Sequence, residues 1–122
     1  MGTYHIIMNE SKAEYLSPHD MGQGAKIREI ELPSKVAIAT AILLANEHYE
    51  HPRAGTWDEA IIVDDETYAD KYYHIKNTYT NISIEMLNFI DGNNIGEEDW
   101  MEDVLDEKCR ELKSWELIHR KI

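Results

Sequence analysis

The segment YLSPHDMGQGAK, residues 15–26, contains the densest group of residues that could bind a ligand. Its histidine and aspartate can form hydrogen bonds, its glycines allow backbone N–H groups to converge on an anion, and its lysine adds a positive charge. The spacing is neither that of a P-loop nor that of a dinucleotide fingerprint. The segment predicts either a site for a carboxylate or nucleotide-like ligand, in a binding protein or a modest enzyme, or a structural loop. The residues concerned are His19, Asp20, Gly22, Gly24 and Lys26.

Metal binding is an alternative for the histidines. His48 and His51 are three residues apart, so they could share one face of a helix. The other side chains of a suitable donor type are His19, Asp20, Asp64 and Asp65. However, histidines at the end of a helix, just before Pro52, are also what the helix dipole and the stop signal favour. We therefore expect neither a metal ion nor another cofactor.

No group of residues predicts catalysis. Asp64 and Asp65 are adjacent on an expected strand, where they would point to opposite faces, so a turn is a better interpretation than an acid/base pair. Cys109 lies within an apolar stripe. The aromatic residues from Trp57 to Tyr79 could stack on a base or a peptide, although their helical spacing is more typical of a core. We expect no catalytic residue and a protein that is not an enzyme.

The negative charge is concentrated in one half of the chain. The net charge is −12, and residues 57–107 contain 15 acidic residues but only Lys71 and Lys76 as bases, a local charge of −13. Such a surface repels nucleic acid and attracts a basic protein. The alternative is a solvated surface that only keeps the protein in solution. The residues expected to bind a partner are Asp64, Asp65, Glu97, Glu98, Asp99, Glu102 and Asp103.

This charge leads to the main functional hypothesis, a non-enzymatic interaction protein that binds a basic protein surface. Inhibitors that phages or mobile elements direct against nucleic-acid-binding defence factors of the host are one such class. The single cysteine cannot form an internal disulfide, and the longest apolar run, residues 36–45, is shorter than the ~20 residues that span a bilayer. We expect a cytoplasmic protein that does not contact a membrane.

The hydrophobic pattern predicts an α+β fold with a small, mainly antiparallel sheet packed by a buried helix. The 122 residues suit one core domain, residues 1–96, followed by a C-terminal helix. Strands are expected at 3–9, 13–16, 25–32 and around 61–63, and helices at 35–48, 68–79 and 84–91, with Ser34 and Ser83 as caps and Gly92 after the last of these helices.

From Glu97 the chain predicts one long amphipathic helix, residues 97–122, with acids in its first turns and bases in its last. Apolar residues recur every three or four positions and form one stripe. The stripe either packs on the core domain or pairs with a second copy in a homodimer. The residues expected at such an interface are Trp100, Leu112 and Trp115.

Four segments resemble a set of small prokaryotic and phage-type proteins that have no known activity. The segments are YLSPHDMGQGAK, ILLAN, TW followed by IIV, and YTNISIEMLNFID. The set shares a Pro-His-x-x-Gly-x-Gly loop, an apolar helix and a Trp-led strand in this order. The resemblance ends before Glu97, and the Trp-Ala-Gly-Asp of the set is replaced here by Trp57-Asp58-Glu59-Ala60. It implies a shared fold and loop, and no reaction.

Overall fold

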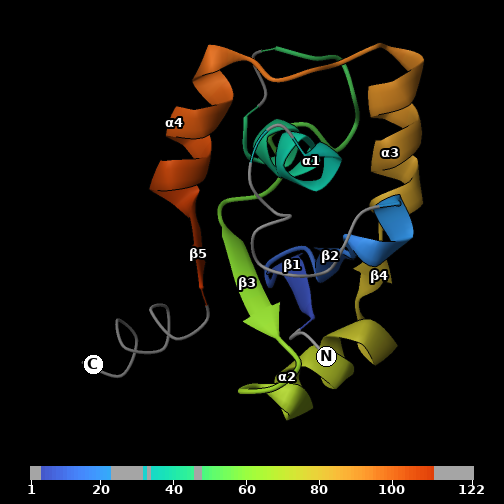
Figure 1. Ribbon diagram of the computed structural model, residues 1–122, viewed down its shortest axis with the longest axis vertical. Helices are drawn as coiled ribbons and strands as arrows, with labels where there is room; N and C mark the ends of the chain where they lie inside the picture. The colour runs from blue at the N-terminus through green and yellow to red at the C-terminus, as the bar shows by residue number, and fades with distance from the viewer. Residues whose placement is uncertain (1–3, 23–31, 33, 46–47, 112–122) are drawn as a thin grey trace.

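A computed structural model describes residues 4–22, 32, 34–45 and 48–111, with only the backbone for residues 110 and 111. The fold is α+β, as predicted (Figure 1). In chain order the elements are β1 (His5–Asn9), β2 (Glu14–Leu16), the short 3-10 helix η1 (His19–Met21), α1 (Lys35–Leu44), β3 (Ala60–Asp64), α2 (Ala69–Thr78), β4 (Thr80–Asn81), α3 (Ser83–Gly92), α4 (Asp99–Lys108) and β5 (Cys109–Glu111).

The described strands form one sheet in the order β4-β2-β1-β3-β5. Its centre is antiparallel, with Ile7 of β1 opposite Leu16 of β2 and Ile62 of β3. The edge strands β4 and β5 run parallel to their neighbours β2 and β3. The predicted antiparallel sheet is therefore confirmed for the three central strands, while the whole sheet is mixed.

Helix α1 is the centre of the molecule. The Ser34 hydroxyl accepts a hydrogen bond from the N–H of Ala37 at 3.3 Å, which confirms the predicted cap. Residues 36–44 are all buried because α1 is apolar on every side, and the sheet, α3 and α4 surround it (Figure 1). The helix ends at Leu44 because the following segment folds back, and Trp57 donates its N–H to the Leu43 carbonyl at 2.9 Å.

The opposite face of the sheet packs on α2. Successive residues of β1 point to opposite faces, so Ile7 joins the core around α1, whereas Ile6 and Met8 join a second cluster with Ile75 of α2. Burial on both faces explains why the three central residues of β1, Ile6, Ile7 and Met8, are all apolar. No helix in the described part of the chain is long and apolar enough to span a membrane.

Four sequence predictions need correction. The helix expected at 35–48 ends at Leu44, and Ala45 is already extended. The helix that begins near Glu97 ends at Lys108, because Cys109–Glu111 is extended and pairs with β3. Residues 112–122 lie outside the described residues. Ser83 is the first residue of α3 and not its cap. Its N–H donates a hydrogen bond to Asn81 Oδ1 at 3.0 Å. Gly92 is the last residue of α3, so it does not follow the helix as predicted. The strand expected at 25–32 falls almost entirely on residues that are not described.

We expect Ile42→Ala to lower the free energy of unfolding by about 2–5 kcal/mol, because it leaves a cavity in the centre of the core. Ile84→Ala is the matched control, since this side chain is 54% exposed and its loss should change stability by less than about 0.5 kcal/mol. Urea unfolding measures both values. Equal effects of the two substitutions would contradict the central place of α1.

Candidate functional site

Three backbone N–H groups of the loop after β2 donate hydrogen bonds within the protein. Ser17 donates its N–H to the Ser83 hydroxyl at 2.7 Å, and Met21 and Gly22 donate theirs to the carbonyls of Pro18 and His19. Gly22 has φ +75°, which explains the glycine at this position. These three N–H groups do not converge on an anion.

Of the described side chains in this loop, that of Asp20 forms a hydrogen bond with another part of the protein, and that of His19 is exposed to solvent. Asp20 accepts a hydrogen bond from Asn81 Nδ2 at 2.8 Å, which joins η1 to the residues that precede α3. Burial of Tyr15 raises the pKa of its hydroxyl group, and the negative charge of Asp20 raises this pKa further. His19 is exposed. Gly24 and Lys26 lie outside the described residues, so the small-ligand site that includes them stays a prediction.

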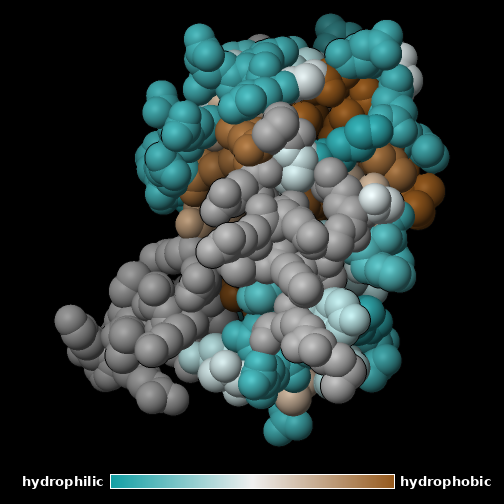
Figure 2. All heavy atoms as spheres, in the orientation of Figure 1, coloured by the Kyte–Doolittle hydropathy of each residue, from teal (hydrophilic) through white to brown (hydrophobic). Residues whose placement is uncertain are grey.

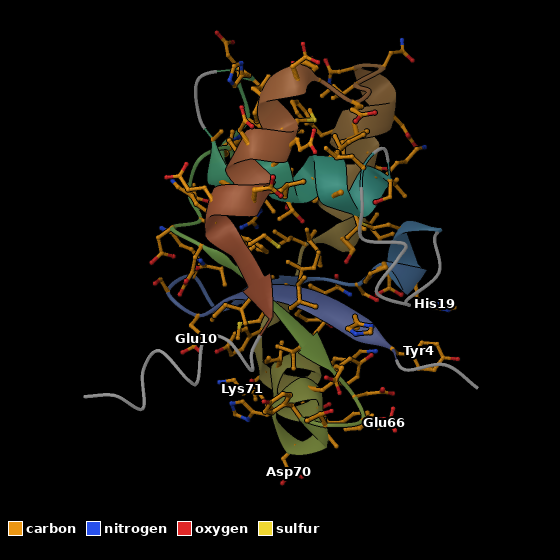
Figure 3. The ribbon with its side chains drawn as sticks, turned by 60° about the vertical axis from the view of Figure 1, so that its left-hand side comes forward. Tyr4, Glu10, His19, Glu66, Asp70 and Lys71 are labelled. Atoms are coloured by element: carbon orange, nitrogen blue, oxygen red, sulfur yellow. The ribbon has the colours of Figure 1, made fainter. Side chains whose placement is uncertain are left out.

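Asp64 is the last residue of β3, and Asp65 is the first residue of the turn that leads to α2. Asp64 Oδ1 accepts from the N–H of Glu66 at 2.9 Å, and Asp65 Oδ1 accepts from the N–H of Tyr4 at 3.0 Å. Strand β3 starts beside β5, at the end of α4, and runs away from it. Figure 3 accordingly shows Glu66 and Asp70 at the α2 end of the molecule. The acidic half of the sequence is therefore divided between two places.

The larger acidic group lies on and just before α4. Residues 97–108 contain seven acids and one base, Lys108, and all seven acidic residues are exposed. Figure 2 shows hydrophilic residues on the outer side of this helix, at the upper left. Among the described side chains, no Lys, Arg or His is within ion-pairing distance of these carboxylates. The opposite side of α4, with Met101 and Leu105, packs on the core around α1.

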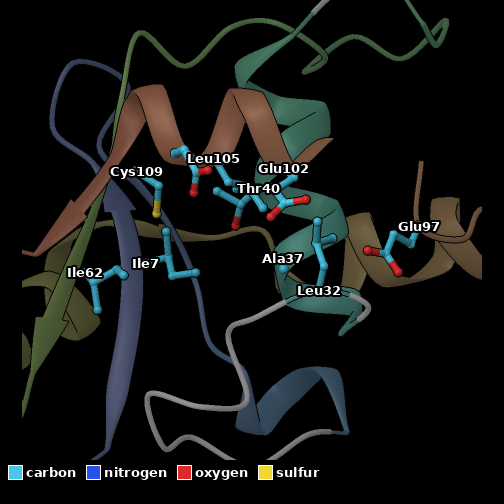
Figure 4. Close-up of a pocket in the computed structure, with 10 residues that line it drawn as sticks. Ile7, Leu32, Ala37, Thr40, Ile62, Glu97, Glu102, Leu105 and Cys109 are labelled. Carbon is cyan, nitrogen blue, oxygen red and sulfur yellow. The ribbon is translucent and has the colours of Figure 1, made fainter. Parts of the chain in front are cut away.

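A pocket of about 530 Å³ opens between α4, α1 and the sheet (Figure 4). Its floor is buried and mostly apolar, whereas its acidic residues are exposed and therefore lie at the opening. The apolar lining comes from Ile7, Leu32, Ala37, Ile62 and Leu105, with Thr40 and Cys109 beside them, and the acidic lining comes from Glu97, Glu102 and Asp106.

The pocket brings together two of the predicted partner-binding residues, Glu97 and Glu102. Asp106 was not predicted, although it follows Glu102 by one helical turn and so lies on the same face of α4. The apolar walls come from segments far apart in the chain, which no local pattern connects. Burial raises the pKa of the Cys109 thiol to about 12, so this wall residue is neutral.

An aromatic cluster fixes the start of α4. Trp100 stacks on His48 with 4.0 Å between ring centroids, so one face of this predicted interface residue is covered. Glu98 accepts hydrogen bonds from the Tyr49 hydroxyl at 2.6 Å and from Trp100 Nε1 at 2.5 Å. Both hydrogen bonds lower the pKa of Glu98, and the bond from Tyr49 has the larger effect. The predicted interface residues Leu112 and Trp115 lie outside the described residues.

The histidines proposed as a metal pair have separate roles. Helix α1 ends before them, so His48 and His51 do not share a helix face. His51 Nδ1 accepts from the N–H of Arg53 at 3.0 Å, and its Nε2 is 3.6 Å from Glu85. Within the described residues, no group of three His, Cys, Asp or Glu side chains could hold a metal ion.

A charged network that the sequence did not predict holds the segment after α1. The Glu14 side chain is 10% exposed; it accepts from Trp57 Nε1 at 2.9 Å and forms an ion pair with Arg53. Arg53 Nε also donates to Glu85 Oε2 at 2.7 Å. Arg53 therefore connects β2 to α3, and Trp57 is held in the core instead of forming a stacking surface.

The chain matches no protein-family model, and comparison with curated proteins and with solved structures finds no similar protein. The resemblance to small prokaryotic and phage-type proteins stays a prediction.

We expect Arg53→Ala to lower the free energy of unfolding by about 3 kcal/mol, because it leaves the nearly buried Glu14 carboxylate without its cation. Lys35→Ala is the control, since the ion pair of Lys35 with Asp91 is exposed and should contribute less than about 1 kcal/mol. Urea unfolding measures both. A loss for Arg53→Ala no larger than that for Lys35→Ala would show that Arg53 does not support this segment.

We expect Tyr49→Phe to change how stability depends on pH. The folded pKa of Glu98 is below its ordinary value of 4.5, so its contribution is present above that pH and is lost as the pH falls through the folded pKa. The difference in unfolding free energy between wild type and Tyr49→Phe should therefore shrink in acid. Tyr73→Phe, at a side chain 54% exposed, is the control. A difference that does not vary with pH would contradict the role of Tyr49.

Proposed function

We propose that the protein is a non-enzymatic interaction protein that binds a basic surface of another protein through α4 and the adjacent pocket. The observation that supports this proposal is the row of exposed carboxylates on α4, unpaired among the described side chains, beside a pocket with an apolar floor. A basic partner would neutralise the carboxylates and cover the apolar surface in the same contact.

The placement of the acids along α4 also supports a binding role. Asp99 is in the first turn, where the positive end of the helix dipole favours it. Asp106 and Glu107 are in the last turn, where the dipole opposes them, and Glu102 and Asp106 repel each other across one turn. The helix would be more stable if Asp106 and Glu107 were neutral residues. Their presence is therefore better explained by attraction to a partner than by stability.

Nucleic-acid-binding proteins are the partner class that fits best, because their Lys and Arg side chains form a basic surface that faces phosphate groups. A protein bound to that surface through α4 would prevent nucleic acid from binding. This is the action expected of an inhibitor from a phage or another mobile element. Complementary charge would also accelerate the encounter of the two proteins.

The proposal is tested by titrating the protein with a synthetic Lys-rich peptide at increasing salt. Affinity should fall as the salt rises from ~0.05 to ~0.5 M, because the distance over which exposed charges interact shortens from roughly 14 Å to roughly 4 Å over this range. The double variant Glu102→Gln/Asp106→Asn should bind about three- to tenfold more weakly than wild type.

The matched control is Glu66→Gln/Asp70→Asn, which removes the same charge at the α2 end (Figure 3). It should bind nearly as well as wild type. Equal losses for the two double variants would show that net charge, and not α4, determines binding. Affinity that does not change with salt would exclude the proposed contact.

A further inference from the structure

We infer that the turn formed by residues 51–54 is pH-sensitive, because the neutral ring of His51 holds it closed and the protonated ring does not. The turn follows α1 and directs the chain back toward it, so that Gly55 donates its N–H to the Ile42 carbonyl at 3.0 Å. The protonation of one side chain therefore controls how firmly this segment covers the end of α1. The inference does not depend on the proposed function.

His51 occupies a position of the turn where another residue type is usual. The N–H of Ala54 donates to the His51 carbonyl at 3.0 Å, and Pro52 is at the second position, where its fixed φ favours a turn. The N–H of Arg53 donates to Nδ1 of the His51 ring, also at 3.0 Å. Asp, Asn and Ser are the usual side-chain acceptors at this first position. Histidine differs from Asn and Ser because protonation removes its acceptor.

The hydrogen bond from Arg53 determines where the neutral ring carries its proton. Nδ1 accepts, so the proton is on Nε2. Protonation adds an N–H at Nδ1, and two donors then face each other. The ring packs on Phe89 of α3 with 4.6 Å between centroids, and the side chain is only 11% exposed, so water has little access to the two N–H groups. The protonated ring therefore cannot keep its place in the closed turn.

The described charged groups around the ring have opposing effects on its protonation. Glu85 of α3 lies 3.6 Å from Nε2 and favours the protonated ring. However, the Glu85 side chain is 44% exposed, and the same Oε2 atom accepts from Arg53 Nε at 2.7 Å. An exposed and shared ion pair contributes little. The positive charge of Arg53, which also pairs with Glu14 of β2, opposes protonation. The loss of the bond to Nδ1 therefore determines the outcome.

The direction of the pH effect follows from these contacts. An imidazole ordinarily takes up a proton near pH ~6.5. The bond from Arg53 to Nδ1 is present above this range and is lost as the pH falls through it. The turn is therefore closed in neutral solution and opens in mild acid.

Amide hydrogen exchange of ¹⁵N-labelled protein at pH ~7.5 and ~5.5, on either side of the ordinary titration of histidine, tests the inference. Protection is expressed relative to the unfolded chain, which removes the direct effect of pH on exchange. The protection of Arg53, Ala54 and Gly55 should fall about tenfold in acid, as expected for the loss of one hydrogen bond. Protection of Ile38 in α1 should not change. Equal protection of the turn at the two pH values would overturn the inference.

His51→Asn isolates the effect of the histidine. The Oδ1 atom of Asn can accept from the N–H of Arg53 in the same way, and it does not titrate in this range. The turn of this variant should be equally protected at both pH values. The control is His19→Asn, at an exposed histidine, which should keep the tenfold loss. A loss in His51→Asn equal to that of wild type would show that another group responds to pH, and would contradict the inference.

A measurement on wild type decides the matter even where His51→Asn does not fold. The ¹⁵N chemical shifts of the imidazole ring show which nitrogen carries the proton. At pH ~7.5, above the ordinary titration range, Nε2 should be protonated and Nδ1 should not, in agreement with the bond from Arg53. A proton on Nδ1 of His51 at this pH would overturn the inference.

Discussion

The burial of α1 is the constraint on which the rest of the structure depends. Nine of its ten residues are buried, so other elements must cover it on every side. The sheet, α3 and α4 do so, and the segment after α1 folds back to donate hydrogen bonds to its last carbonyls (Figure 1). Glu14 and Arg53 then fix that segment to β2 and α3. Covering one apolar helix thus determines the position of α4.

The same packing separates structural acids from acids that are free to bind. Asp64 holds the turn that follows β3 by accepting a hydrogen bond from the N–H of Glu66, whereas Asp20 and Asp65 accept hydrogen bonds from Asn81 and Tyr4, which are distant in the chain. On α4 the apolar side faces α1, so its carboxylates are directed to solvent and to the edge of the pocket. Fold and proposed function therefore depend on the same helix, whose inner side stabilises the core and whose outer side would bind the partner.

Local patterns predicted much of the fold, because each depends on neighbouring residues. The apolar surface of α1, the Ser34 cap and the β1–β2 hairpin are examples. The parallel edge strands were missed, since β4 and β5 are very short and their partners are distant in the chain. Cys109 continues the helical spacing of α4, so only its pairing with β3 reveals that the helix has ended.

The candidate site was predicted only in part for a similar reason. Charge counting identified Glu97 and Glu102, but it also grouped them with Asp64 and Asp65, which the course of β3 separates from α4. The central claim is that α4 and its pocket form the binding surface. Amide chemical shifts in ¹⁵N-labelled protein titrated with the Lys-rich peptide test it directly. Changes confined to α4 and the pocket walls are expected, and changes centred on α2 would contradict the claim.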